Sequence, residues 1–139
     1  VSFYEPHSSI ALVGDMVAGF GSIWIGTPDG NMNDYFESLE KLKALNAVAL
    51  APGHGDVIYN VHQKLDEVGL HRLQRLEQVM GALTANPLAL SELRLQIYPE
   101  IDKRMTTLAE QSLLALLEKL EQDSKVSRTT DNHWRLVHP

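Results

Sequence analysis

The sequence contains no cysteine among its 139 residues. That absence excludes disulfide bonds, thiolate metal ligands and thiol nucleophiles. It also fits a reducing compartment, so we expect a cytoplasmic protein. No apolar run approaches the roughly 18 residues that a membrane-spanning helix needs, and no signal peptide is recognisable at the start. Hydrophobic residues make up 44% and charged residues 22%, which is typical of a globular chain.

Basic residues are scarce at the front of the chain. Residues 1–60 carry seven acidic and only two basic side chains, whereas residues 101–139 carry six of each. An acidic front disfavours non-specific binding of nucleic acid and suits a metal site. The balanced tail leaves nucleic-acid binding open without indicating it.

A strand, a helix and a second strand follow one another in the first part of the sequence. A strand over residues 2–4 is followed by the short apolar run 9–13, which predicts a buried strand. Asp34 is typical of a helix N-cap, and apolar residues at helical spacing continue to Asn46. Residues 48–50 predict the next strand. This alternation indicates a layered α/β fold.

The rest of the sequence predicts helices and a terminal β-hairpin. Apolar residues at helical spacing indicate a long helix over residues 64–83 and shorter helices over 91–98 and 107–121. Residues 126–136 predict a hairpin with Asp131–Asn132 at its tip. Helices followed by a terminal hairpin are the outline of a winged helix-turn-helix.

Asn86–Pro87 is the best candidate for a domain boundary, because proline interrupts a helix and the sequence pattern changes beyond it. We therefore expect two domains, residues 1–86 and residues 87–139.

Two residues stand out as candidate metal ligands. Asp15 follows the predicted strand 9–13, and His54 lies between glycines after the predicted strand 48–50. Side chains at the ends of such strands can converge on one edge of a sheet, and carboxylate and imidazole are good ligands for Zn²⁺. Taken alone, each residue fits a turn or an exposed loop better than a metal site.

Four motifs occur in a characteristic order: Gly14–Asp15–Met16–Val17, then Asp34–Tyr35 with Ser38–Leu39, then Pro52–Gly53–His54–Gly55, then His71–Arg72 with Arg75. This order of motifs resembles the metallo-β-lactamase-fold hydrolase superfamily. It is most similar to the glyoxalase II-like and β-lactamase-like branch with a C-terminal winged-helix extension. The sequence resembles only the C-terminal portion of those proteins.

The resemblance implies an α/β fold: the second half of an αββα metallo-β-lactamase sandwich, followed by an α-helical winged-helix-like module. It implies two divalent metal ions, expected to be Zn²⁺, in the intact protein. Asp15 would bridge the two ions and His54 would complete the shell of the second. We expect the two side chains to face each other at about 4–6 Å, the separation of two ligands of one ion.

The sequence departs from the family at the other metal ligands. The His-x-His-x-Asp-His motif of the family is absent. His7 follows a proline as a family histidine does, but it lacks the glycine and is too near Asp15, so we interpret it as a turn residue. With Asp15 and His54 alone, this chain should bind metal weakly or not at all, and it contains no catalytic set of its own.

Two basic groups remain as lesser candidates. His71, Arg72 and Arg75 could contact an anionic substrate, but a solvated helix face with local salt bridges to Glu67 and Glu77 is the favoured interpretation. The hairpin combines basic and aromatic residues that could touch nucleic acid, although packing of the hairpin on the helices is favoured: Lys125, Arg128, His133, Trp134 and Arg135.

The sequence thus predicts a fragment of a metal-dependent hydrolase of esters, thioesters or phosphodiesters that is inactive alone. The alternative is a non-catalytic winged-helix module that binds nucleic acid or protein. For the hydrolase we expect a small-molecule substrate and no membrane partner. We also expect an exposed apolar sheet face, covered in a homodimer or by a complementing chain.

Overall fold

A computed structural model describes residues 1–21 and 23–137 of the chain. The chain divides into two compact units: residues 1–23 with 33–72, and residues 24–32 with 73–139. Residues 138 and 139, the end of the predicted second domain, lie outside the described residues. The predicted domain boundary at residues 86 and 87 stays a prediction, because a division by compactness is not a division into evolutionary modules.

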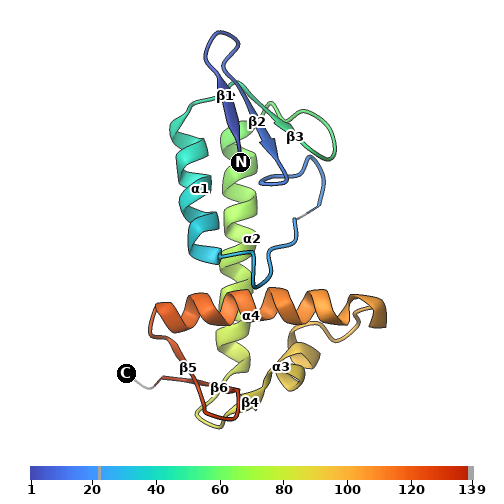
Figure 1. Cartoon of the computed structure of the whole chain (residues 1–139), viewed down its shortest axis with the longest axis vertical. Helices are drawn as coiled ribbons and strands as arrows, with labels where there is room; N and C mark the ends of the chain where they lie inside the picture. The colour runs from blue at the N-terminus through green and yellow to red at the C-terminus, as the bar shows by residue number, and fades with distance from the viewer. Residues whose placement is uncertain (22, 138–139) are drawn as a thin grey trace. The chain divides into compact units, whose positions relative to one another are not determined.

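The first unit is a small sheet with helices on one face (Figure 1). Its elements are β1 (Phe3–Glu5), β2 (Ile10–Gly14), α1 (Met32–Ala44), β3 (Ala49–Pro52) and the first part of α2 (Val61–Ala82). The strand order is β1–β2–β3, with β2 antiparallel to β1 and parallel to β3. Because β2 and β3 are parallel, their carboxyl ends lie at the same edge of the sheet, and α1 is the crossover between them.

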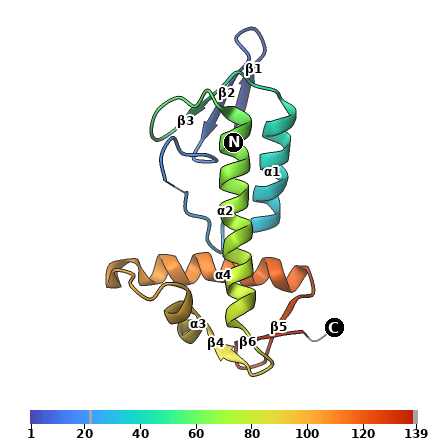
Figure 2. The same cartoon turned by 180° about the vertical axis from the view of Figure 1, so that it is seen from behind.

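One face of this sheet forms the core of the unit. Ala11 and Val13 of β2 and Leu50 of β3 are buried, as are Leu39 of α1 and Leu65 of α2. Figures 1 and 2 show α1 and the first part of α2 running side by side next to the sheet. The alternation of buried and exposed residues along β2 is the period of two expected for a strand covered on one side.

The opposite face of the sheet is apolar and exposed. Phe3 of β1 is paired directly with Leu12 of β2, and the two side chains are 65% and 52% exposed. This confirms the apolar sheet face expected from the sequence.

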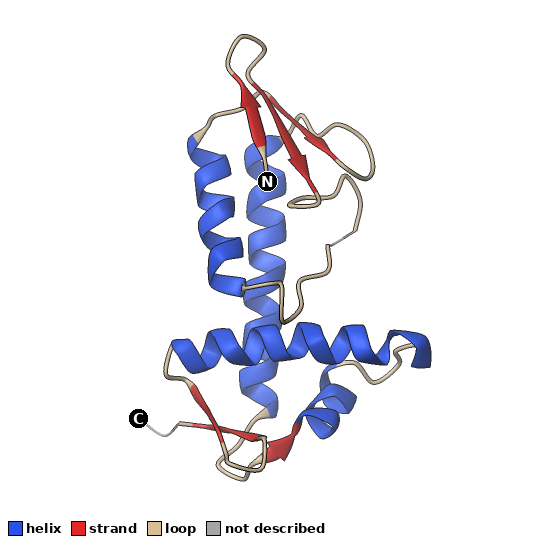
Figure 3. Cartoon of the chain, in the orientation of Figure 1, coloured by secondary structure: helices blue, strands red, loops and turns tan. Residues whose placement is uncertain are grey.

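The second unit has the element order of a winged helix (Figure 3). Beyond α2 it contains β4 (Leu88–Ala89), α3 (Leu90–Ile97), the short 3₁₀ helix η1 (Lys103–Met105), α4 (Thr106–Gln122), β5 (Val126–Arg128) and β6 (His133–Leu136). The sheet order is β4–β6–β5, and all pairings are antiparallel. Trp134 of β6 is only 1% exposed, and buried leucines of α3 and α4 complete the core: Leu93, Leu113, Leu116, Leu117 and Leu120.

Residues 24–32 also belong to the second unit, although they precede α1 in the sequence. Ile25 and Met32 are buried, and the backbone N–H of Thr27 donates to the carbonyl oxygen of Gln111 on α4 at 3.5 Å. The segment 24–32 therefore lies against α4.

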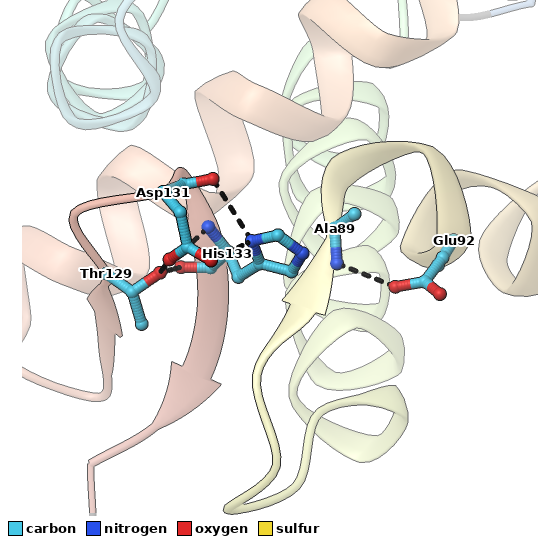
Figure 4. Close-up of polar contacts among 5 residues, drawn as sticks. All are labelled: Ala89, Glu92, Thr129, Asp131 and His133. Carbon is cyan, nitrogen blue, oxygen red and sulfur yellow. Dashed lines mark hydrogen bonds and ion pairs between the residues drawn. The ribbon is translucent and has the colours of Figure 1, made fainter.

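The hairpin turn of the winged helix is held by short side chains (Figure 4). The Thr129 hydroxyl donates to Asp131 Oδ1 at 2.5 Å and accepts the backbone N–H of His133 at 3.0 Å. In the same view, Glu92 accepts the backbone N–H of Ala89 at 2.8 Å at the start of α3. The predicted hairpin is thus confirmed.

The helices agree with the sequence to within a few residues, and most differences lie at their ends. The first helix begins at Met32, so Asp34 lies in its first turn and is not the N-cap that the sequence suggested. A carboxylate in the first turn still favours the helix, because it faces the positive end of the helix dipole. Strand β4 was not predicted, since two residues carry no readable period.

Candidate metal site

The loops that follow β2 and β3 are joined through their backbones at the carboxyl edge of the sheet. The N–H of Gly53 donates to the carbonyl oxygen of Gly14 at 2.9 Å, and the N–H of Gly19 donates to that of His54 at 2.9 Å. These bonds place Asp15 and His54 next to each other, although 39 positions separate them.

Asp15 and His54 are in direct contact. The His54 Nδ1 lies 2.7 Å from Asp15 Oδ1, and the side chains of His54 and Asp15 are 71% and 73% exposed. An ionised carboxylate can only accept a hydrogen bond, so the Nδ1–H of His54 is the donor. The predicted convergence is confirmed, but the predicted separation of 4–6 Å is wrong, because the two groups attract each other into a direct hydrogen bond.

The donor set fits part of a metal site. An imidazole and a carboxylate, both open to solvent, are suitable Zn²⁺ ligands. Within residues 1–21 and 23–137, no group of three or more His, Asp or Glu side chains could hold a metal ion. Asp15 and His54 therefore offer two candidate donors, whereas a tetrahedral Zn²⁺ site uses four ligands.

His7 lies in the turn between β1 and β2, as the sequence indicated. Its N–H donates to Glu5 Oε1 at 2.9 Å, while the hydroxyl and N–H of Ser8 donate to Glu5 Oε2. These hydrogen bonds lower the pKa of Glu5, and the bond from the Ser8 hydroxyl has the largest effect. The turn is explained by local hydrogen bonding without a role in the site.

Arg72 and Arg75, the lesser candidates on α2, are used for packing. Arg72 donates to the carbonyl oxygen of Ile23, and its guanidinium lies 5.7 Å from the ring centre of Tyr35. Burial raises the pKa of Tyr35, and the charge of Arg72 opposes this shift. In the second unit, Arg75 lies 4.9 Å from the ring centre of Tyr98. The sequence did not predict these cation–π contacts of Arg72 and Arg75.

The basic residues of the hairpin also have structural contacts. Arg128 lies 5.4 Å from the ring centre of Trp134, and His133 Nδ1 lies 3.2 Å from Asp131 Oδ2. The burial of Trp134 confirms that the hairpin packs on the helices.

The first unit is thus a parallel strand–helix–strand unit with Asp15 and His54 at its carboxyl edge, and the second unit has the element order of a winged helix. Residues 90–134 match the family model described as the beta-lactamase associated winged helix domain. The chain is 32% identical over 114 residues to the beta-lactamase-like protein 2 homolog of Caenorhabditis elegans, covering 81% of this chain and 37% of that protein.

Two further similarities extend this comparison. The chain is 33% identical over 81 residues to the atrochrysone carboxyl ACP thioesterase of Aspergillus fumigatus, covering 58% of this chain and 24% of that protein. A crystal structure of a metallo-beta-lactamase family protein from Thermus thermophilus superposes with a TM-score of 0.84 at 26% identity, over 98% of this chain and 44% of that one. The chain thus spans less than half the length of these relatives.

The chain belongs to the metallo-β-lactamase-fold superfamily, with part of the α/β domain followed by the associated winged helix. No helix among the described residues is long and apolar enough to cross a membrane.

Proposed function

We propose that this chain is part of a metal-dependent hydrolase, in which Asp15 would bridge two divalent ions and His54 would hold the second. The observation that carries the proposal is the contact between Asp15 and His54 at the carboxyl edge of the sheet. Bound Zn²⁺ or a similar ion would supply an activated water and polarise the bond to be hydrolysed. The chain's own residues would hold the ions, Asp15 through its carboxylate and His54 through its imidazole.

We propose an ester, thioester or phosphodiester of a small molecule as the substrate. A thioester has support from the similarity to a protein named as a thioesterase. Because the described residues offer two donors at this edge, we expect the chain alone to bind metal weakly and to be inactive. The remaining ligands would come from residues outside this chain, which spans 37% of its Caenorhabditis elegans relative.

The alternative function, a nucleic-acid-binding winged helix, has less support. In such proteins the second helix of the helix-turn-helix enters the major groove. Here the corresponding helix, α4, is in contact with segment 24–32, and Arg128 is stacked on Trp134. We expect no submicromolar, salt-sensitive binding of duplex DNA in a fluorescence anisotropy titration. Such binding would favour the alternative.

The proposal is tested in the longer native protein that contains this chain. Bound metal is measured by mass spectrometry, and turnover is measured with p-nitrophenyl acetate, an acetyl thioester and bis-p-nitrophenyl phosphate. His54→Ala should lower both the metal content and turnover. His7→Ala, which removes another exposed histidine, should change neither. A longer protein without bound metal, or His54→Ala with full metal and turnover, would contradict the proposal.

A further inference from the structure

Glycines line the contact between the two loops that carry Asp15 and His54. A Cβ atom on Gly19 would lie 2.6 Å from both the backbone N and O of Asp56. Gly55 has a φ of +86°, and a Cβ there would lie 2.8 Å from Phe20 Cδ1 and 2.9 Å from Gly19 Cα. At both positions a side chain would collide with backbone atoms of the other loop, so these glycines let the loops approach.

Gly53 differs from these two glycines. Its φ is not in the left-handed region, and a Cβ atom would meet only one atom at less than 3 Å, Asp15 Oδ1 at 2.9 Å. The next nearest atoms belong to the Gly14 backbone at 3.4 and 3.6 Å, which is ordinary contact. The space left by the missing side chain of Gly53 is therefore bounded by the same carboxylate oxygen that accepts the hydrogen bond of His54.

We infer that Gly53 is a positioning residue, whose missing side chain leaves the space that lets the Asp15 carboxylate reach His54. An alanine at this position leaves the backbone unstrained, because the conformation is open to L residues and the obstructing atom is the mobile end of a side chain. We expect the carboxylate to turn away and the contact with His54 to be lost. The inference rests on the metal-binding role proposed for Asp15 and His54, but its first readout requires no metal.

The first readout is the tautomer of His54 in this chain. At a pH where the imidazole is neutral, the hydrogen bond to Asp15 holds the proton on Nδ1, because one ring nitrogen donates and the other does not. Long-range ¹H–¹⁵N correlation spectra report which nitrogen carries the proton. The Asp15→Ala variant provides the spectrum of His54 without its partner.

The test compares Gly53→Ala with Gly81→Ala. Gly81 lies on α2, where a Cβ atom would meet nothing within 4 Å, so it is a matched control for adding one methyl group. We expect Gly53→Ala to show the His54 spectrum of Asp15→Ala, with an unfolding midpoint close to that of the unsubstituted chain. Gly81→Ala should keep the original His54 spectrum. If Gly53→Ala keeps the Nδ1–H tautomer, or if it unfolds the chain, the inference is wrong.

The second readout is Zn²⁺ affinity in the longer native protein. In that protein, Gly53→Ala should displace the Asp15 carboxylate and weaken Zn²⁺ binding by about ten- to a hundred-fold, which is the range for residues that orient metal ligands. Gly81→Ala should leave the affinity unchanged, and equal affinities of the two variants would overturn the inference. If the unsubstituted protein binds no Zn²⁺, the proposed function fails, whereas the tautomer of His54 still decides the role of Gly53.

Discussion

The indole Nε1–H of Trp24 donates a hydrogen bond to the backbone carbonyl oxygen of Leu108, 3.1 Å away and 84 positions later in the sequence. Trp24 is 48% exposed, so the bond lies at the surface of the second unit. Together with the backbone bond of Thr27, it attaches segment 24–32 to α4. A segment that precedes α1 in the chain is thus part of the winged-helix unit.

We expect Trp24→Phe to destabilise the second unit by about 0.5–1.5 kcal/mol, because the ring is largely kept while a hydrogen bond is lost. Urea unfolding followed by circular dichroism measures the change. Tyr59→Phe removes a polar atom from a ring that is 76% exposed, and should change stability by less than about 0.5 kcal/mol. Equal stability of Trp24→Phe and the unsubstituted chain would mean that the bond does not hold the segment.

The second prediction concerns an ion pair between α1 and α2. Lys43 Nζ lies 2.8 Å from the Asp66 carboxylate, and this contact lowers the pKa of Asp66 below its ordinary value of 3.8. The hydrogen bonds that Lys43 donates to Asp66 and then to Glu40 raise the pKa of Lys43 above 10.5. The contribution of Asp66 to stability is therefore complete above about pH 3.8 and is lost as the pH falls through its folded-state pKa. The contribution of Lys43 to stability is complete below about pH 10.5 and is lost as the pH rises through its folded-state pKa.

Asp66→Asn should lower the urea midpoint at neutral pH, and the difference from the unsubstituted chain should shrink as the pH falls through the folded-state pKa of Asp66. Glu77→Gln removes another exposed acidic charge from the same helix and is the control. Because the Asp66 carboxylate is exposed and the pair is screened by solvent, the effect should also shrink in high salt. A difference that persists unchanged at low pH would rule out the ion pair as its cause.

The third prediction concerns the exposed sheet face that contains Phe3 and Leu12. We expect the isolated chain to bind a hydrophobic dye there and to self-associate in sedimentation velocity, because exposed apolar patches favour association. Leu12→Ser should reduce both effects. Leu70→Ser removes a leucine of similar exposure from α2, 56% against 52%, and should reduce them less. If both variants behave alike, the association does not depend on this face.

Much of the fold was predictable because the signals are local. The apolar residues of α2 and α4 repeat at helical spacing within each helix. The turn residues between β5 and β6 lie within one hairpin. The parallel neighbours β2 and β3 followed from the strand–helix–strand order, since such crossovers place their strands in one sheet. The convergence of Asp15 and His54 followed in turn, because both come after parallel strands.

The remaining features depend on contacts that no local pattern encodes. Segment 24–32 carries glycines and a proline, which indicate a loop but not the helix on which it lies. The glycines on either side of His54 are plain in the sequence, but their closest contacts, which are with another loop, are not. The predicted separation of Asp15 and His54 was wrong because it assumed that both side chains bind one metal ion. In the structure the two side chains are hydrogen-bonded directly to each other.

The last prediction concerns Asp15 in the longer native protein. Asp15→Ala should lower turnover by more than about a hundred-fold, because losing a ligand shared by two ions costs more than losing a residue that only orients a ligand. The side chain is 73% exposed, so the free energy of unfolding should change by less than about 0.5 kcal/mol. Asp15→Asn, which keeps the shape but loses the charge, should retain less metal than the unsubstituted protein. Asp29→Ala removes another exposed acidic residue and should leave turnover and metal content intact. Full turnover in Asp15→Ala would mean that the carboxylate touching His54 binds no catalytic metal, and the proposed hydrolase site would have to lie elsewhere.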